Sequence, residues 1–83
     1  MKILYFAWLR EKVGVAQEEL TVPAQVRTVG DLALWLGQRS AGHAAAFANA
    51  KLVRCAINQE FAGVETPIAG AAEIAFFPPV TGG

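Results

Sequence analysis

One segment with the periodicity of a helix, flanked on both sides by strand-like segments, is the feature that most constrains the fold of this chain. Between positions 29 and 36 the apolar residues Val29, Leu32, Ala33 and Leu36 recur at helical spacing, with Trp35 beside them. The chain has 83 residues, which is enough for one small core and too few for two. This pattern predicts a single domain in which one main helix packs across a sheet.

Local signals predict where this helix begins and ends. Thr28 with Asp31 three residues later resembles a capping box, and Ser40 to Gly42 provide a stop. The alanines that follow, in residues 43–50, favour a short second helical turn.

Five segments have strand character. Residues 2–9 (KILYFAWL) are rich in β-branched and aromatic residues and apolar on both faces, which predicts a first strand. After a loop around Gly14, residues 18–23 alternate and predict an antiparallel partner that stops at Pro23. The later predicted strands are residues 51–58, a possible short strand within 59–63, and residues 73–77. The order of elements predicts an α+β roll of the β-grasp type, with a mixed sheet and the helix on one face.

A sheet covered by one helix leaves its second face without cover. The last strand places Ile74 and Phe76 on one side and Phe77 on the other, so apolar side chains point both ways. Two explanations remain open: the spare face binds a partner, or the fold curls enough to bury these side chains itself.

Composition excludes several functions. Seven basic and seven acidic residues give a formal net charge of zero, so we expect no nucleic acid and no anionic membrane surface as partner. The longest apolar run, residues 3–9, is too short to span a membrane and lacks a cleavage site for a signal peptide. With a single cysteine as well, we expect a cytoplasmic protein.

The lone cysteine and the lone histidine are weak candidates for chemistry. Alternation groups Cys55 with Val53 and Ile57, which predicts a buried core thiol in place of a nucleophile or persulfide carrier. His43 has no Cys, Asp or second His at ligand spacing, so we expect no metal site.

The C-terminal residues FFPPVTGG are the strongest functional signal. Pro78 and Pro79 lack backbone donors, so the last strand should end near Phe77 and residues 78–83 should form a flexible tail. Gly82 and Gly83 have no side chains, so this backbone fits a narrow channel in another protein. A carboxylate needs activation before it reacts, and the sequence contains neither GxxxxGK[ST] nor GxGxxG. We therefore expect the chain to be the substrate of an ATP-using partner.

These residues also carry a family resemblance. EIAFFPPVTGG (73–83) is similar to the C-terminus of the small subunits of molybdopterin synthase, a family of ubiquitin-like sulfur carriers. ILYFAWLREKVG (3–14) and AINQEF (56–61) resemble further segments of that family, while TVGDLALWL (28–36) matches only in kind. The chain departs from the family at one place. The family usually has an acidic turn before the last strand, whereas residues 69–72 of this chain carry no acidic side chain and only Glu73, directly after them, is acidic.

The resemblance implies a role for the last two residues. Gly83 would be adenylated by an E1-like enzyme and converted to a thiocarboxylate, with Gly82 as its required neighbour. No bound cofactor is expected, only an AMP adduct or a thiocarboxylate on Gly83. The sulfur would pass to cyclic pyranopterin monophosphate inside the large subunit, which would supply the catalytic residues in a heterotetramer of two small and two large subunits. The expected partner-binding residues are Phe6, Arg10, Phe61, Phe77, Pro78, Pro79, Val80 and Thr81.

Other functions share these features. A sister sulfur carrier for thiamine or tRNA thiolation would have the same fold and the same Gly-Gly. A ubiquitin-like modifier would join the tail to lysines. An independent enzyme is disfavoured, because one Cys, one His and scattered carboxylates do not make up a set of nucleophile, base and oxyanion donor.

Overall fold

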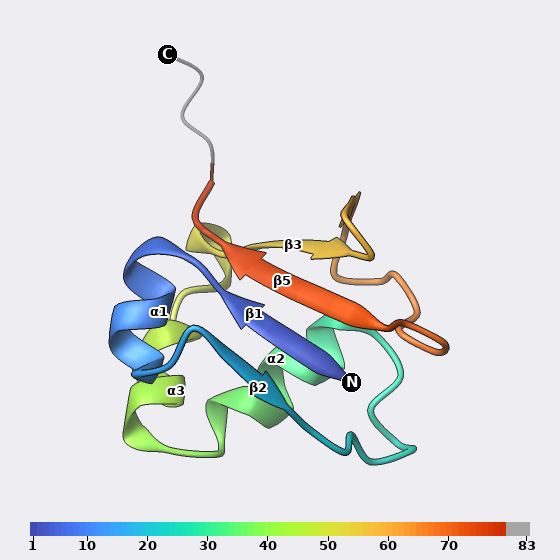
Figure 1. Ribbon diagram of the computed structural model, residues 1–83, viewed down its shortest axis with the longest axis horizontal. Coiled ribbons are helices and arrows are strands. Elements are labelled where there is room, and N and C mark those ends of the chain that lie inside the picture. Colours follow the sequence, from blue (N-terminus) through green and yellow to red (C-terminus); the bar gives the residue numbers. More distant parts are fainter. Residues whose placement is uncertain (80–83) are drawn as a thin grey trace.

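The computed structural model describes residues 1–79, which form a mixed sheet with helices on one face (Figure 1). The strands run through the front of the molecule in Figure 1, and α2 and α3 lie behind them. The elements in chain order are β1 (Lys2–Tyr5), α1 (Ala7–Val13), β2 (Gln17–Glu19), α2 (Val29–Gly37), α3 (Ala41–Ala46), the 3₁₀ turn η1 (Ala50–Leu52), β3 (Arg54–Ile57), β4 (Glu60–Ala62) and β5 (Glu73–Phe77).

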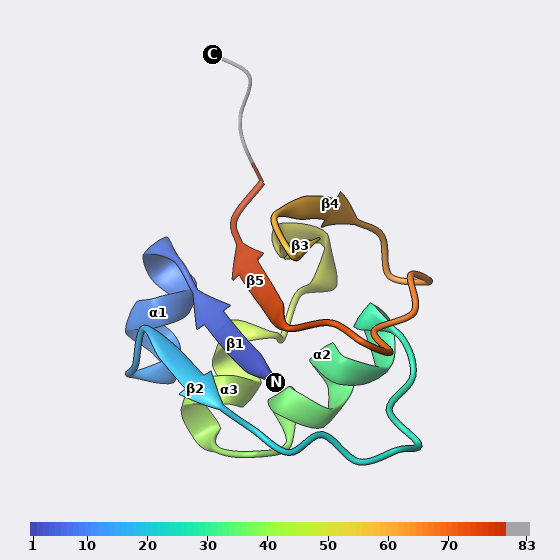
Figure 2. The ribbon, with the colours of Figure 1, turned by 45° about the vertical axis from the view of Figure 1, so that its right-hand side comes forward.

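The sheet has the strand order β2-β1-β5-β3-β4. The two central strands, β1 and β5, are parallel, with Tyr5 opposite Phe76, and the other neighbours are antiparallel. This mixed sheet with helices on one face confirms the predicted β-grasp roll. Because β5 is the middle strand, its C-terminal end lies in the middle of the sheet, and the β5 arrow points upward in Figure 2.

The main helix is confirmed, although its end lies earlier than predicted. The Thr28 side chain accepts a hydrogen bond from the Asp31 N–H at 3.2 Å, and Asp31 Oδ2 accepts one from the Arg27 N–H at 3.1 Å. The helix ends at Gly37, and Ser40 begins α3 as its N-cap. The stop signal that we expected at Ser40 is therefore the start of the next helix.

The prediction of one strand over residues 2–9 is wrong in its second half. The strand ends at Tyr5, Phe6 is the N-cap, and α1 begins at Ala7, whose φ is 54°. Leu9 and Val13, four residues apart, lie on the face of α1 that packs on the core. Gly14, at φ 97°, ends the helix and donates its N–H to the Arg10 carbonyl.

The other strands are confirmed, the last one with the predicted bounds, 73–77, and the rest with shorter ones. The second strand covers residues 17–19 in place of 18–23, because β1 offers it only a short antiparallel partner. The third begins at Arg54, since Ala50 to Leu52 form the 3₁₀ turn. At the β3–β4 hairpin, Asn58 and Gln59 both have positive φ, as a tight two-residue hairpin requires.

The core lies between the sheet and the helices. Alternate residues of β1 and β5 point into it, so Ile3, Tyr5, Ile74 and Phe76 are buried there. Cys55 belongs to the same core with 5% of its surface exposed, which confirms its predicted burial. None of the helices in residues 1–79 is long and apolar enough to cross a bilayer.

Candidate functional site

The face of the sheet turned away from the helices carries the candidate site. Across β5, Ala75 pairs with Leu4 on one side and Ala56 on the other, and Ala56 in turn pairs with Phe61 of β4. These residues alternate with the core residues along each strand, so they share the outer face. The centre of this face is therefore apolar.

Two aromatic rings dominate the end of this face that adjoins the tail. Phe61 and Phe77 contact each other with ring centroids 5.8 Å apart and ring planes at 55°. Phe61 is 84% exposed, whereas Phe77 is half-buried. The fold thus buries Phe76 on the inner side and leaves the outer aromatic pair open to a partner.

Phe6 lies next to the same region and comes from the N-terminal part of the chain. Phe6 donates its N–H to the Phe76 carbonyl at 3.0 Å, which places it beside the end of β5, and it is 49% exposed. Arg10 follows four residues later, on α1, and is exposed. The structure brings Phe6 and Phe77 to the same end of the sheet, as an interface requires.

The end of the last strand agrees with the prediction from the sequence. The last strand ends at Phe77, and Pro78 and Pro79 follow it half-buried. The other predicted tail residues, Val80, Thr81, Gly82 and Gly83, lie outside the described residues.

The turn before β5 lacks acidic side chains and is held in another way. Gly70 has φ 78°, and the Ala71 N–H donates to the Ile68 carbonyl at 3.0 Å. Asn58 Oδ1 accepts hydrogen bonds from the N–H groups of Ala72 and Glu73, at 3.1 and 3.0 Å. The Asn58 side chain therefore fixes the start of the strand that leads to the tail, which explains an asparagine in the AINQEF segment.

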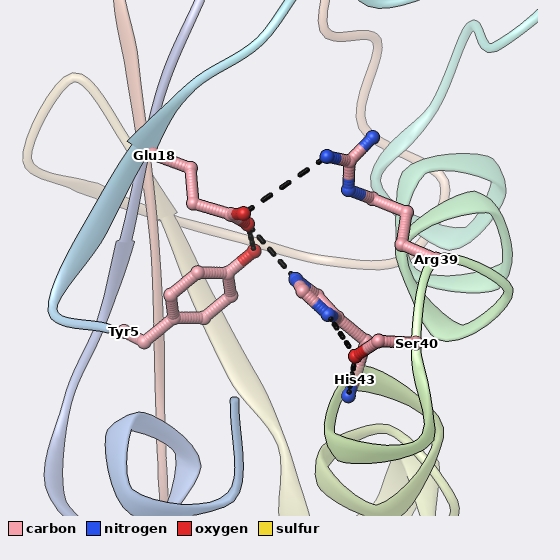
Figure 3. A network of polar contacts seen from close by, with 5 residues as sticks. All are labelled: Tyr5, Glu18, Arg39, Ser40 and His43. Atoms are coloured by element: carbon pink, nitrogen blue, oxygen red, sulfur yellow. Dashed lines mark hydrogen bonds and ion pairs between the residues drawn. The ribbon is translucent and has the colours of Figure 1, made fainter. Parts of the chain in front are cut away.

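Figure 3 shows a polar network that sequence analysis missed, formed by Tyr5, Glu18, Arg39, Ser40 and His43. Glu18 Oε2 accepts the Tyr5 hydroxyl at 2.7 Å and lies 2.9 Å from His43 Nε2. Ser40 Oγ accepts the His43 backbone N–H at 3.1 Å and lies 2.7 Å from His43 Nδ1. The three-residue spacing of Ser40 and His43 is a local cap signal, but nothing local points to Glu18.

Burial and the neighbouring groups have opposite effects on the pKa of Glu18 and the same effect on the pKa of Tyr5. Partial burial would raise the pKa of the Glu18 carboxyl, but hydrogen bonds from His43 and Tyr5, with the positive charges of His43 and Arg39, lower that pKa overall. Burial and the Glu18 carboxylate raise the pKa of the Tyr5 hydroxyl.

Serine, histidine and glutamate are the residue types of a catalytic triad, but here Ser40 contacts Nδ1 of His43 and Glu18 contacts Nε2, the reverse of the triad arrangement. Ser40 Oγ is the N-cap acceptor of α3, so helix capping explains its position. We assign the network a structural role, which is to tie the first two strands to α3.

The environment of Cys55 shows whether its thiol could react. A cavity of about 300 Å³ between α2 and the β3–β4 hairpin is lined largely by apolar residues and reaches Cys55. Burial raises the pKa of the Cys55 thiol to about 11, so the thiol stays protonated near neutral pH and is a poor nucleophile. Within residues 1–79 no group of three His, Cys, Asp or Glu side chains could hold a metal ion.

This chain is similar over nearly its full length to known sulfur carriers and to a solved structure. The model of the ThiS family matches residues 3–83. The molybdopterin synthase sulfur carrier subunit of Escherichia coli (strain K12) is 40% identical over 83 residues, which is 100% of this chain and 99% of the relative. The protein of the same name from Haemophilus influenzae is 36% identical with the same coverage. The crystal structure of SAMP1 from Haloferax volcanii superposes with a TM-score of 0.71 at 28% identity, covering 100% of this chain and 98% of that one.

Proposed function

The chain belongs to the ThiS family, and from this premise we propose that it is the sulfur-carrier subunit of a molybdopterin synthase. Two relatives named as such subunits match it over its full length. The structural observation that supports the proposal most is the aromatic pair at the base of the tail, formed by the exposed Phe61 and the half-buried Phe77. A carrier needs a body that docks and a tail that reaches into the partner.

The proposed chemistry takes place at the carboxyl group of Gly83. A carboxylate oxygen attacks the α-phosphate of ATP in an E1-like adenylating enzyme, which releases pyrophosphate and leaves an AMP adduct. A sulfur donor at the sulfide level then attacks the acyl carbon and displaces AMP, which leaves a thiocarboxylate. The thiocarboxylate sulfur forms a bond to a carbon of cyclic pyranopterin monophosphate in place of an oxygen substituent. Water then hydrolyses the acyl–sulfur bond, which restores the carboxylate and leaves the sulfur on the pterin. Gly82 keeps the neighbouring backbone free of side chains, so a narrow channel can hold it.

The body of the domain positions the tail for this chemistry. We assign docking on the large synthase subunit to Phe6, Arg10, Phe61 and Phe77, with residues 78–81 entering the large subunit. Exposed aromatic side chains and arginines are typical anchors of protein interfaces. The assembly that we propose is a heterotetramer of two small and two large subunits, and the large subunit supplies the catalytic groups.

Intact mass of the chain from its native host tests this function. We expect a species heavier by one exchange of sulfur for oxygen, located at Gly83 by fragmentation, and co-purification with the large subunit. A thiazole synthase partner would instead favour a carrier for thiamine. Isopeptide bonds between Gly83 and lysines, without a thiocarboxylate, would identify a protein modifier and refute the proposal.

A further inference from the structure

Arg54 stands beside the aromatic pair although no sequence signal assigned it a role. It is the first residue of β3, it is exposed, and its register partner on β5 is Phe77. Opposite residues of antiparallel strands point to the same face with Cβ atoms about 5 Å apart. Arg54 is therefore a neighbour of Phe77 on the outer face, at the end of the sheet where Pro78 departs.

The guanidinium of Arg54 is held in place by the backbone. Its Nη1 donates to the carbonyls of Lys51 and Val53 at 3.1 and 3.3 Å, at the start of β3. Among residues 1–79, no carboxylate lies within ion-pair distance of this guanidinium, and Nη2 and Nε make no hydrogen bond. A guanidinium has five N–H donors in a planar fork, so one edge is anchored and donors remain for a partner.

The charges of the outer face are unevenly distributed. Its carboxylates Glu19 and Glu73 both lie opposite Lys2, at the end of the sheet remote from the tail. The end next to the tail carries Arg54, opposite Phe77. A partner that covers the aromatic pair therefore meets the positive charge of Arg54, which is complementary to an acidic side chain.

We propose that Arg54 is a further docking residue, which receives a carboxylate of the large synthase subunit beside Phe77. This inference rests on the proposed function and names the chemistry of the partner surface. Gly83 is the sixth residue after Phe77, and six residues of extended chain reach about 20 Å. Arg54 therefore contributes to association at the base of the tail, and the thiocarboxylate reacts beyond its reach.

Titration of the thiocarboxylated chain with the large subunit tests this role. We expect Arg54→Gln to weaken the Kd at least about tenfold at low salt, mainly through slower association, and the difference to shrink at high salt. Arg54→Lys keeps the positive charge but loses the planar fork of donors. Its Kd should therefore lie between that of the wild type and that of Arg54→Gln. The matched control is Arg27→Gln, at an exposed arginine just before α2, which should bind as the wild type does.

Sulfur transfer gives a second readout. The concentration of large subunit at half-maximal rate should rise for Arg54→Gln while the maximal rate holds. Thermal melting supplies the folded fraction, which corrects each Kd.

An unchanged Kd and salt dependence for Arg54→Gln, or an equal loss for Arg27→Gln, would overturn the assignment. So would a fall in maximal rate without a change in half-saturation. If the wild-type chain neither carries sulfur nor binds the large subunit, the proposed function itself is wrong, and this inference fails with it.

Discussion

His43 and Glu18 are 25 positions apart in the sequence, yet His43 Nε2 lies 2.9 Å from Glu18 Oε2. The two side chains are only 8% and 18% exposed, so water competes little for the contact. Because Glu18 is on β2 and His43 is in α3, the pair joins the edge of the sheet to a helix. The Tyr5 hydroxyl donates to the same carboxylate oxygen and extends the link to β1.

The first prediction is that Glu18 gives the domain a measurable acid sensitivity. Its pKa is lowered in the folded state, so the stability that it adds is present above its ordinary value of 4.5. That stability declines as the pH falls below 4.5 through the folded-state pKa. Glu18→Gln should destabilise the domain by about 1 to 3 kcal/mol at neutral pH. The free energy of unfolding of this variant should also change less between neutral and acidic pH than that of the wild type.

Denaturant unfolding of the variant and the wild type across this pH range measures the effect. Glu19→Gln is the matched control, because the Glu19 side chain is 77% exposed and makes only a 3.6 Å contact with the N-terminal amine. Parallel pH profiles for the wild type and Glu18→Gln would refute the role of the network.

The second prediction separates binding from stability in the aromatic pair. Phe61 is 84% exposed, so Phe61→Ala should leave the unfolding temperature nearly unchanged and weaken binding to the large subunit. Phe77→Ala should cost about 2 kcal/mol or more of binding, which is roughly thirtyfold in Kd. Since Phe77 is half-buried, it should also cost about 1 kcal/mol of stability.

Calorimetric titration and thermal melting of both variants check this. Leu34→Ala removes a 72% exposed side chain from α2, away from the sheet's outer face, and should bind normally. If Phe77→Ala lowers stability but binds normally after correction for the folded fraction, Phe77 is a core residue and not an anchor.

The third prediction is that Cys55 is not used for sulfur transfer. Cys55→Ala should enlarge the neighbouring cavity and cost about 1 kcal/mol of stability, with sulfur transfer unchanged. The buried thiol, with its pKa raised to about 11, supplies no thiolate near pH 7. Loss of transfer in a variant with normal folding, measured by circular dichroism and product formation, would contradict this.

The fourth prediction concerns Gly83. Deletion of this residue should abolish sulfur transfer and leave the unfolding temperature unchanged, because glycine has no side chain to bury in a core. Product formation with purified partners and thermal melting measure the two effects. A truncated chain that still supports product formation would show that the Gly83 carboxylate is not the working group.

Local sequence determined several elements of this protein correctly. The main helix follows from its apolar spacing and the Thr28 cap, and the end of β5 follows from Pro78, since a proline cannot donate to the ladder. The burial of Cys55 follows from alternation along its strand. Each of these depends on interactions within a few residues, which a sequence displays directly.

Tertiary structure alone decided what depends on distant partners. Residues 3–9 are apolar on both faces, so their pattern fits a strand or a helix. The chain leaves the ladder after Tyr5, opposite Phe76, and packing of Leu9 on the core favours α1. The His43–Glu18 contact and the place of Arg54 beside Phe77 likewise join residues that no local period relates. Sequence periodicity shows which side of an element is buried, but only the packing of the whole chain shows which residues meet there.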